Sequence, residues 1–370
     1  MSDALIFDAI RTPRGKGKPG AGALYETKPI DLVVTLLDAL RMTNSTFDNG
    51  VFAVFLAGVL LPNKVRVFID YLTAALQDSE TADLARCAKM AEEWGYDEVN
   101  LNCGCPSERV QRGSFGACLM AEPQLVADCV KAMVDAVSIP VTVKHRIGLN
   151  EMDVRAHAKD YQFTLDFICQ VAEAGASQVT IHARNAILKG LSPKENRTIP
   201  PLQYDMAKQL RLDAQKHFPH LKVLLNGGLE NNGDIARYWN DFDGFMIGRA
   251  AYHTPGIMLD WDEMLATDGQ AYGSFFGVEQ WNRVTEELIN QCVRWLHHCQ
   301  ATGEHFHLAA ITRHILGLAH GKGGSKHWRR KLSDYRLLGA VKTEQDVRAF
   351  FEDANKELRM YIEQDEADEV

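Results

Sequence analysis

The chain has 370 residues, of which 46% are hydrophobic and eight are cysteines, and its formal net charge at pH 7 is −9. A chain of this length and apolarity can bury two cores, which excludes a largely disordered protein. The negative charge argues against indiscriminate binding to nucleic acid, although a local basic surface is compatible with it. Irregularly spaced cysteines without a secretory leader predict reduced thiols in a cytoplasmic protein. No apolar run is long enough to span a bilayer, so no membrane association is expected.

The first 44 residues predict a strand, a basic loop rich in glycine and proline, and a helix. The phrase from Ala4 to Gly17 resembles the N-terminus of the degradative thiolases. None of the cysteine and histidine motifs of that family follows, so thiolase chemistry is not expected. Residues 45–76 combine a strand pattern at Val51–Leu61 with a helix opened by Pro62, and they carry no chemical motif.

From Ser79 onward, helix and strand patterns alternate at the spacing of parallel βαβ units. The expected strands are Glu98–Cys103, Val141–His145, Gln178–His182, Val223–Asn226 and Gly244–Ile247. Parallel strands joined by helices predict an α/β fold of the (β/α)8 TIM-barrel type over residues 77–265.

Chemically suggestive residues stand at the carboxyl end of each expected strand: Cys105, Lys144, His182, Asn226-Gly227-Gly228 and Gly248-Arg249. The carboxyl ends of barrel strands form the active-site face, so these residues are expected to lie together. Each also has an ordinary structural interpretation. Cysteines are often small core residues, a strand-end lysine often forms a salt bridge, and a lone histidine is often a satisfied core residue.

The two glycine turns predict a grip for phosphate. Backbone N–H groups of Asn226-Gly227-Gly228 and of Gly248 can approach a phosphate closely, and the guanidinium of Arg249 can neutralise it. Lys144 and His182, on neighbouring strands, would place a cation and a titratable imidazole above it. Cys105 could donate a proton across the same space.

Residues 266–350 predict an all-α domain, with helices at Trp281–Cys299 and Leu308–His320, and residues 351–370 predict a solvated acidic tail. Between Lys322 and Lys331 lie five cations with Trp328 among them, which suits a nucleic-acid backbone and a stacked base. An exposed basic loop is the alternative. A metal site is a weaker alternative, because the spacing of its candidate ligands matches no structural zinc pattern: His297, His298, Cys299, His305 and His307.

Seven phrases, in order, resemble the A subfamily of the tRNA-dihydrouridine synthases over about residues 77–338. They are Asp97–Ser107, Gly116–Met120, Val141–Gly148, Ile181–Arg184, Leu191–Arg197, Ile199–Leu202 and Ile311–Leu318. The resemblance implies an FMN enzyme in which NADPH reduces the flavin and the flavin gives hydride to C6 of a D-loop uridine, at position 20 or 20a. It implies that Cys105 protonates C5 and that tRNA is the partner of a monomeric enzyme.

The same resemblance assigns two further sets of residues. Those expected to hold FMN are Lys144, His182, Asn226, Gly227, Gly228, Gly248 and Arg249. Those expected to contact tRNA are Asn102, Lys194, Arg197, Lys326 and Arg329.

The chain departs from the family in four places. Lys326 stands where arginine is expected, Cys103 replaces a residue such as valine, and residues 150–161 resemble an insertion. The first three barrel strands of the family, with their flavin contacts, are missing from residues 1–76. The alternative hypothesis is therefore an inactive fusion or truncated synthase that retains only tRNA binding.

Overall fold

The computed structural model describes residues 81–93, 96–106, 116–149, 157–271, 277–303 and 305–369. The expected segments 1–44 and 45–76, the missing front of the barrel, and most of the expected insertion at 150–161 lie outside these ranges. The chain divides into two compact units, Met1–Leu229 with Tyr238–Ile247, and Glu230–Arg237 with Gly248–Val370. None of the described helices is long and apolar enough to cross a membrane.

The first unit contains a sheet of five parallel strands in the order β1-β2-β3-β4-β5. The strands are β1 (Val99–Cys103), β2 (Val141–Arg146), β3 (Gln178–His182), β4 (Lys222–Asn226) and β5 (Gly244–Met246). All five were expected, and no boundary differs by more than one residue. Parallel strands joined by helices confirm the α/β class.

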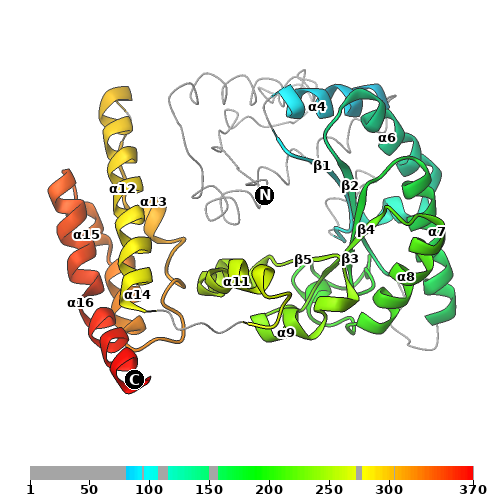
Figure 1. The fold of residues 1–370 in the computed structure, drawn as a ribbon. Helices are drawn as coiled ribbons and strands as arrows, with labels where there is room; N and C mark the ends of the chain where they lie inside the picture. The colour runs from blue at the N-terminus through cyan, green and yellow to red at the C-terminus, as the bar shows by residue number, and fades with distance from the viewer. Residues whose placement is uncertain are drawn as a thin grey trace. The chain divides into compact units, whose positions relative to one another are not determined.

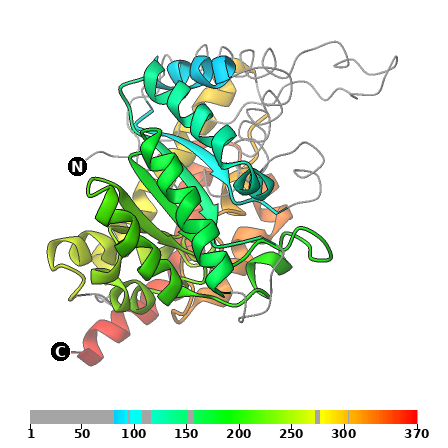
Figure 2. The ribbon, with the colours of Figure 1, turned by 90° about the vertical axis from the view of Figure 1, so that its right-hand side faces the viewer.

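Helices cover one face of this sheet (Figures 1 and 2). The helical elements of the first unit are α4 (Thr81–Glu93), η2 (Gly116–Ala121), α6 (Pro123–Ala136), α7 (His157–Glu173), η4 (Glu195–Arg197), α8 (Tyr204–His217) and η5 (Trp239–Asp241). Alternate strand residues such as Leu101, Val143 and Val223 are buried in the core that these helices complete. Slipping a strand by one residue would turn this apolar set away from the helices, so burial fixes the register.

The second unit is built from helices in the part of the chain that the structure describes. They are α9 (Asn232–Arg237), α10 (Arg249–His253), η6 (Pro255–Asp260), α11 (Trp261–Ala266), α12 (Val278–Thr302), α13 (Ala309–Thr312), α14 (Ser325–Ser333), α15 (Tyr335–Ala340) and α16 (Glu344–Glu369). Trp281 of α12 and Trp328 of α14 are fully buried, with ring centroids 5.2 Å apart. Phe351 of α16 packs against Trp328 at 6.2 Å.

Two expectations for this unit differ from what is observed. The helix expected at Leu308–His320 is wrong beyond Thr312, where turns follow α13. In those turns a Cβ added to Gly317 would lie 2.0 Å from the carbonyl oxygen of His253, so the chain passes too closely for a regular helix with side chains. Helix α16 runs through residue 351, where the acidic tail was expected to begin, because Leu358 and Ile362 continue its buried stripe among the acids.

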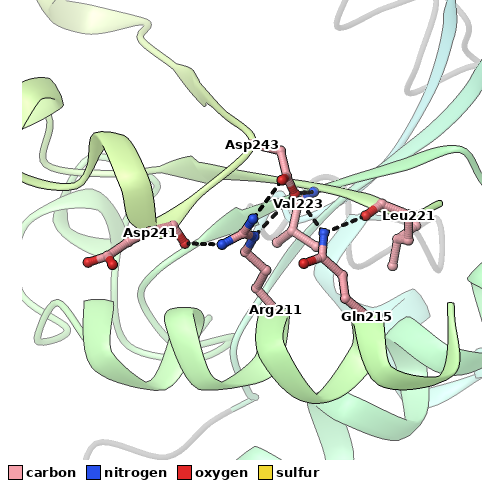
Figure 3. Close-up of polar contacts among 6 residues, drawn as sticks. All are labelled: Arg211, Gln215, Leu221, Val223, Asp241 and Asp243. Carbon is pink, nitrogen blue, oxygen red and sulfur yellow. Dashed lines mark hydrogen bonds and ion pairs between the residues drawn. The ribbon is translucent and has the colours of Figure 1, made fainter. Parts of the chain in front are cut away.

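A carboxylate clamp ties α8 to the last two strands (Figure 3). Asp243, just before β5, accepts hydrogen bonds from Nη2 of Arg211 at 2.8 Å, from Nε2 of Gln215 at 2.9 Å and from the amide of Val223 at 2.7 Å. Nη1 of Arg211 also donates to the carbonyl oxygen of Asp241 at 3.2 Å. Partial burial acts to raise the pKa of Asp243, but the hydrogen bonds from Arg211 and Val223 outweigh it and lower the pKa.

We expect the substitution Asp243→Asn to lower the free energy of unfolding by about 1 kcal/mol at pH 7, since the carboxylate is partly exposed and its bonds are correspondingly screened. Because folding lowers the pKa of Asp243, its contribution is complete above the pKa of an unfolded aspartate, about 3.9, and disappears as the pH falls further. Denaturant titrations should therefore show a smaller difference in the free energy of unfolding between wild type and variant at pH 3 than at pH 7.

Asp135→Asn is the matched control for this prediction. Asp135 pairs with Lys131 on α6, but both side chains are about 60% exposed, so the change should cost less than about 0.5 kcal/mol. Equal losses in the two variants at pH 7 would contradict a specific role for the clamp.

Candidate functional site

The sheet register brings four of the predicted residues to one edge. Asn102 of β1 pairs with Lys144 of β2, and His182 of β3 pairs with Asn226 of β4. Arg146, two residues after Lys144, pairs with His182. The alternation that buries the apolar side chains against the helices thus places these polar residues on the opposite face, at the carboxyl ends of adjacent strands.

Cys105 follows β1 by two residues and is partly exposed, whereas Cys103 is fully buried on the helix-covered face. Burial raises the pKa of the Cys103 thiol strongly, and the nearby Cys129 adds to this effect. The core interpretation therefore holds for Cys103, and only Cys105 of this pair presents an accessible sulfur. A thiolate at Cys105 would raise the pKa of both Lys144 and Arg146, which places the sulfur within electrostatic reach of two cations.

The backbone around Cys105 is held on both sides. The side-chain oxygen Oδ1 of Asn102 accepts a hydrogen bond from the amide of Gly104 at 3.1 Å. The carbonyl oxygen of Cys105 accepts one from the amide of Ala117 at 2.9 Å. Asn102 thus shapes the turn that presents the thiol.

The pKa of Lys144 is lower than that of an ordinary lysine. Burial, followed by the charge of Arg146, lowers the pKa of Lys144 to about 8. An anionic group placed beside this ammonium would oppose both effects. Lys144 is therefore suited to hold an anion, and it forms no salt bridge with any acidic side chain in the described ranges.

His182 is 7% exposed, and burial together with the charges of Arg146 and Lys144 lowers its pKa well below the usual range. The imidazole is therefore neutral at pH 7. Among the residues that the structure describes, its Nε2 atom is buried and has no hydrogen-bond partner. A buried polar atom of this kind usually serves a ligand or a water.

Asn226-Gly227-Gly228 forms a tight turn after β4. Gly227 and Gly228 have φ angles of +101° and +73°, which residues with a Cβ adopt at a cost. A Cβ on Gly227 would lie 3.0 Å from Nε2 of His182, so the bare backbone leaves room beside the unpartnered imidazole. Tyr204 donates to the carbonyl oxygen of Gly227 at 2.6 Å, and Asn226 donates to that of Met246 at 2.7 Å.

Gly248 and Arg249 belong to the second unit, where Arg249 begins α10. A Cβ added to Gly248 would meet no atom within 4 Å, so crowding within the chain does not require a glycine there. Their part in a phosphate grip stays a prediction.

Of the five expected tRNA contacts, Asn102 lies at the sheet edge beside Lys144, and the other four fall in two groups. Lys194 is exposed and Arg197 is partly buried, on either side of Asn196 at η4. Lys326 and Arg329 are exposed one helical turn apart on α14 of the second unit. Trp328 between them cannot stack on a base, because it is 0% exposed and its indole N–H donates to the carbonyl oxygen of Ile315 at 3.1 Å.

The loop that carries Lys194 and Arg197 is organised by residues that the sequence analysis did not single out. The side chain of Asn196 donates to the carbonyl oxygen of Ile187 at 2.9 Å and accepts from the amide of the same residue at 2.8 Å. Ser192 and Glu195 cap each other's amides, at 2.8 and 3.3 Å. The Ser-x-x-Glu spacing is a capping box and was a readable signal for this turn.

The alternative metal site finds no support. Within the described ranges, no group of three or more histidine, cysteine or acidic side chains is arranged to hold a metal ion. Cys299 is 1% exposed on α12, and the rings of His305 and His307 stack on each other with centroids 4.3 Å apart.

Comparisons with known proteins cover most of the chain. A family model described as "Dihydrouridine synthase (Dus)" matches residues 71–355. The chain is 48% identical to a protein of Pseudomonas putida named tRNA-dihydrouridine(20/20a) synthase, over 75% of this chain and 77% of that protein. It is 47% identical to a protein of the same name from Vibrio parahaemolyticus, over 71% of this chain and 74% of that protein. A solved structure of nitroalkane oxidase from Streptomyces ansochromogenes aligns with 61% of this chain and 56% of that one, at 13% identity and a TM-score of 0.29, which is too low to inform the fold.

Proposed function

The chain belongs to the dihydrouridine synthase family, and from that premise we propose that it reduces a D-loop uridine of tRNA, at position 20 or 20a, to 5,6-dihydrouridine with FMN and NADPH. It is an oxidoreductase. The observation that carries the proposal is the row of strand-end residues Cys105, Lys144, His182 and Asn226, found in a chain nearly half identical to named synthases.

Two features of the site fit a flavin mononucleotide. The glycine turn at Gly227 and Gly228 lacks the Cβ atoms that would contact His182, Leu202 and Tyr204, which suits a close approach of an anionic group to the backbone. The buried Nε2 of His182 lacks a partner in the described residues, and Lys144 has a pKa of about 8 that a neighbouring anion would raise. FMN, when bound, supplies the hydride that reduces C6 of the uracil ring. Lys144, His182, Asn226, Gly227 and Gly228 would hold it, with Gly248 and Arg249 as further candidates.

Cys105 would deliver the proton that the reduction requires at C5. General acids act when they lie within hydrogen-bonding distance of the atom that they protonate, and the turn held by Asn102 keeps the thiol at the mouth of β1. Lys144 and Arg146 would stabilise the thiolate that remains after the transfer. The thiolate then regains a proton from solvent, so that NADPH, one proton and uridine yield NADP⁺ and dihydrouridine.

Four cations are suited to the phosphates of tRNA: Lys194, Arg197, Lys326 and Arg329. Lys194, Lys326 and Arg329 are exposed, and phosphate contacts of this type position a nucleic acid without reading its sequence. Lys326 would act as a point charge, since an ammonium lacks the bidentate geometry of a guanidinium.

Incubation of the purified chain with unmodified tRNA, FMN and NADPH tests the proposal. Nuclease digestion followed by mass spectrometry should show dihydrouridine, and a tRNA with cytidine at positions 20 and 20a should yield none. If the chain binds tRNA but does not bind FMN and does not accept electrons from NADPH, the result supports the inactive alternative instead.

The affinity for FMN should depend on pH through Lys144. Its pKa of about 8 in the free chain means that anion binding above pH 8 must be accompanied by proton uptake. The association constant for FMN should thus be nearly constant from pH 6 to 7.5 and fall by up to about tenfold per pH unit above pH 8. Fluorescence titration measures this. In Lys144→Met, binding should be weaker at pH 7 and lose the slope above pH 8, and an unchanged slope would contradict the assignment.

A further inference from the structure

Arg146 lies at the strand-end edge, and the proposed function assigns it no contact with flavin or tRNA. It ends β2 and is 2% exposed. Burying a guanidinium is costly unless its N–H groups are satisfied. Burial therefore lowers the pKa of Arg146 to about 10, and the charges of Arg197 and Arg184 act in the same direction. The contacts that offset the cost of burying this charge indicate what Arg146 does.

The guanidinium donates hydrogen bonds to three backbone carbonyl oxygens, one in the loop after β1 and two in the connection between β3 and α8. Its Nε atom donates to Gly104 at 3.1 Å. Its Nη1 atom donates to Asn185 at 3.3 Å and to Asn196 at 3.0 Å. The planar fork of an arginine can join three separated acceptors in this way, and the single nitrogen of a lysine cannot span the same positions.

Two of the three acceptors adjoin a segment with a proposed function, and the third is held by its own side chain. Gly104 immediately precedes Cys105, and Asn196 lies between Lys194 and Arg197. Asn185 is anchored through its own side chain, which donates to Asp160 at 2.6 Å and accepts from Gln203 at 3.2 Å. The guanidinium of Arg146 therefore connects, by hydrogen bonds, the loop of Cys105 to the segment that carries Lys194 and Arg197.

We propose that Arg146 is a positioning residue that fixes the Cys105 loop relative to the segment Lys194–Arg197, so that binding of tRNA places the target uracil over the thiol. The inference rests on the proposed function. Arg146 acts through Gly104 and Asn196, and it need not touch the substrate. A displacement of about 1 Å in such an arrangement reduces rates by about 100-fold, because proton transfer depends steeply on distance.

The test compares Arg146→Lys and Arg146→Met with the wild-type holoenzyme. Lysine retains the charge and loses the three-way hydrogen bonding, whereas methionine loses both. Two readouts are used: the rate at which tRNA oxidises the NADPH-reduced enzyme, and the pH–rate profile for alkylation of Cys105 by iodoacetamide, followed by peptide mass spectrometry. The second readout requires neither tRNA nor turnover.

In both variants the tRNA-dependent rate should fall by about 30- to 100-fold, while NADPH still reduces the flavin at a rate within about twofold of wild type. The rate of alkylation of Cys105 should differ from the wild-type rate at the same pH in both variants, because the loop that carries the thiol loses the hydrogen bond from Arg146 to Gly104. A wild-type rate of uridine reduction in Arg146→Lys would overturn the proposal, because charge alone would then suffice.

Arg184→Met provides the matched control. Arg184 is also a cation of this edge, and it donates to the carbonyl oxygens of Thr198 and Pro200, beyond the segment of interest, without bonding to Gly104. Its alkylation profile should match that of wild type. If Arg184→Met and Arg146→Met slow alkylation and transfer equally, Arg146 has no specific link to the thiol loop. If wild type itself fails to reduce tRNA, the proposed function fails, and an altered alkylation rate in Arg146→Lys and Arg146→Met would still report the contact with the Cys105 loop.

Discussion

Replacing Cys105 with alanine should reduce the rate of uridine reduction by at least about 100-fold and leave reduction of the flavin by NADPH unchanged. A positioned general acid contributes about 10²- to 10⁴-fold to a proton transfer, and alanine has no proton to give. Cys105 is the partly exposed thiol at the mouth of β1, whose sulfur lies within electrostatic reach of Lys144 and Arg146. Anaerobic stopped-flow spectroscopy separates the two half-reactions, because each changes the flavin absorbance.

Cys118→Ala is the control for that substitution. Cys118 is also partly exposed and lies in η2, close behind Cys105 in the sequence, and burial raises its pKa. Its replacement should leave both half-reactions within about twofold of wild type. If Cys105→Ala retains more than a tenth of the tRNA-dependent rate, another group supplies the proton.

Gly227→Ala should weaken the binding of FMN by more than about tenfold. A Cβ at a φ of +101° costs about 1 kcal/mol or more, and it would lie 3.0 Å from the buried imidazole of His182, closer than an ordinary van der Waals contact. The substitution therefore displaces His182 and fills the cradle that we assign to the flavin. Isothermal titration with FMN gives the dissociation constant, and circular dichroism checks that the fold persists.

Gly303→Ala separates backbone strain from loss of the cradle. Gly303 ends α12 with a φ of +75°, and an added Cβ there would meet no atom within 4 Å. We expect a loss of about 1 kcal/mol in the free energy of unfolding and no change in the FMN dissociation constant. If Gly227→Ala bound FMN as tightly as Gly303→Ala, the turn after β4 would not be part of the flavin site.

The sheet was predictable because its strands are short, apolar on alternate residues and bounded by glycine, proline or a polar turn. Lys144, His182 and Asn226 were expected to lie together because they stand at the carboxyl ends of successive parallel strands. A strand pattern fixes where each strand ends. The residues at the edge of the candidate site could therefore be predicted from the sequence.

Arg146 was overlooked although it stands two residues after Lys144, on the same face of β2. A charged residue at a strand end is expected at the surface, and the carbonyl groups that satisfy this one belong to Gly104, Asn185 and Asn196, which are distant from it in the sequence. Only the folded chain brings those acceptors together. Asn196 was overlooked for the same reason, because its partners lie within a loop that has no periodic pattern.

Trp328 was expected to be exposed and is buried. Its cationic neighbours suggested an exposed aromatic, but Leu332 one helical turn later is also buried, so the two residues mark the inner stripe of α14. Burial of an aromatic ring contributes more to stability than exposure, and the cations occupy the remaining surface of the helix. The helical spacing, weighed against the charge pattern, would have given the correct prediction.

The most direct test of the account is a single-turnover reaction of the reduced enzyme with unmodified tRNA in the absence of oxygen. The account predicts one dihydrouridine per reduced flavin, mapped to position 20 or 20a, with the flavin oxidised at the rate at which the product forms. Oxidation of the flavin without formation of dihydrouridine, or an enzyme that cannot be loaded with FMN at all, would contradict it.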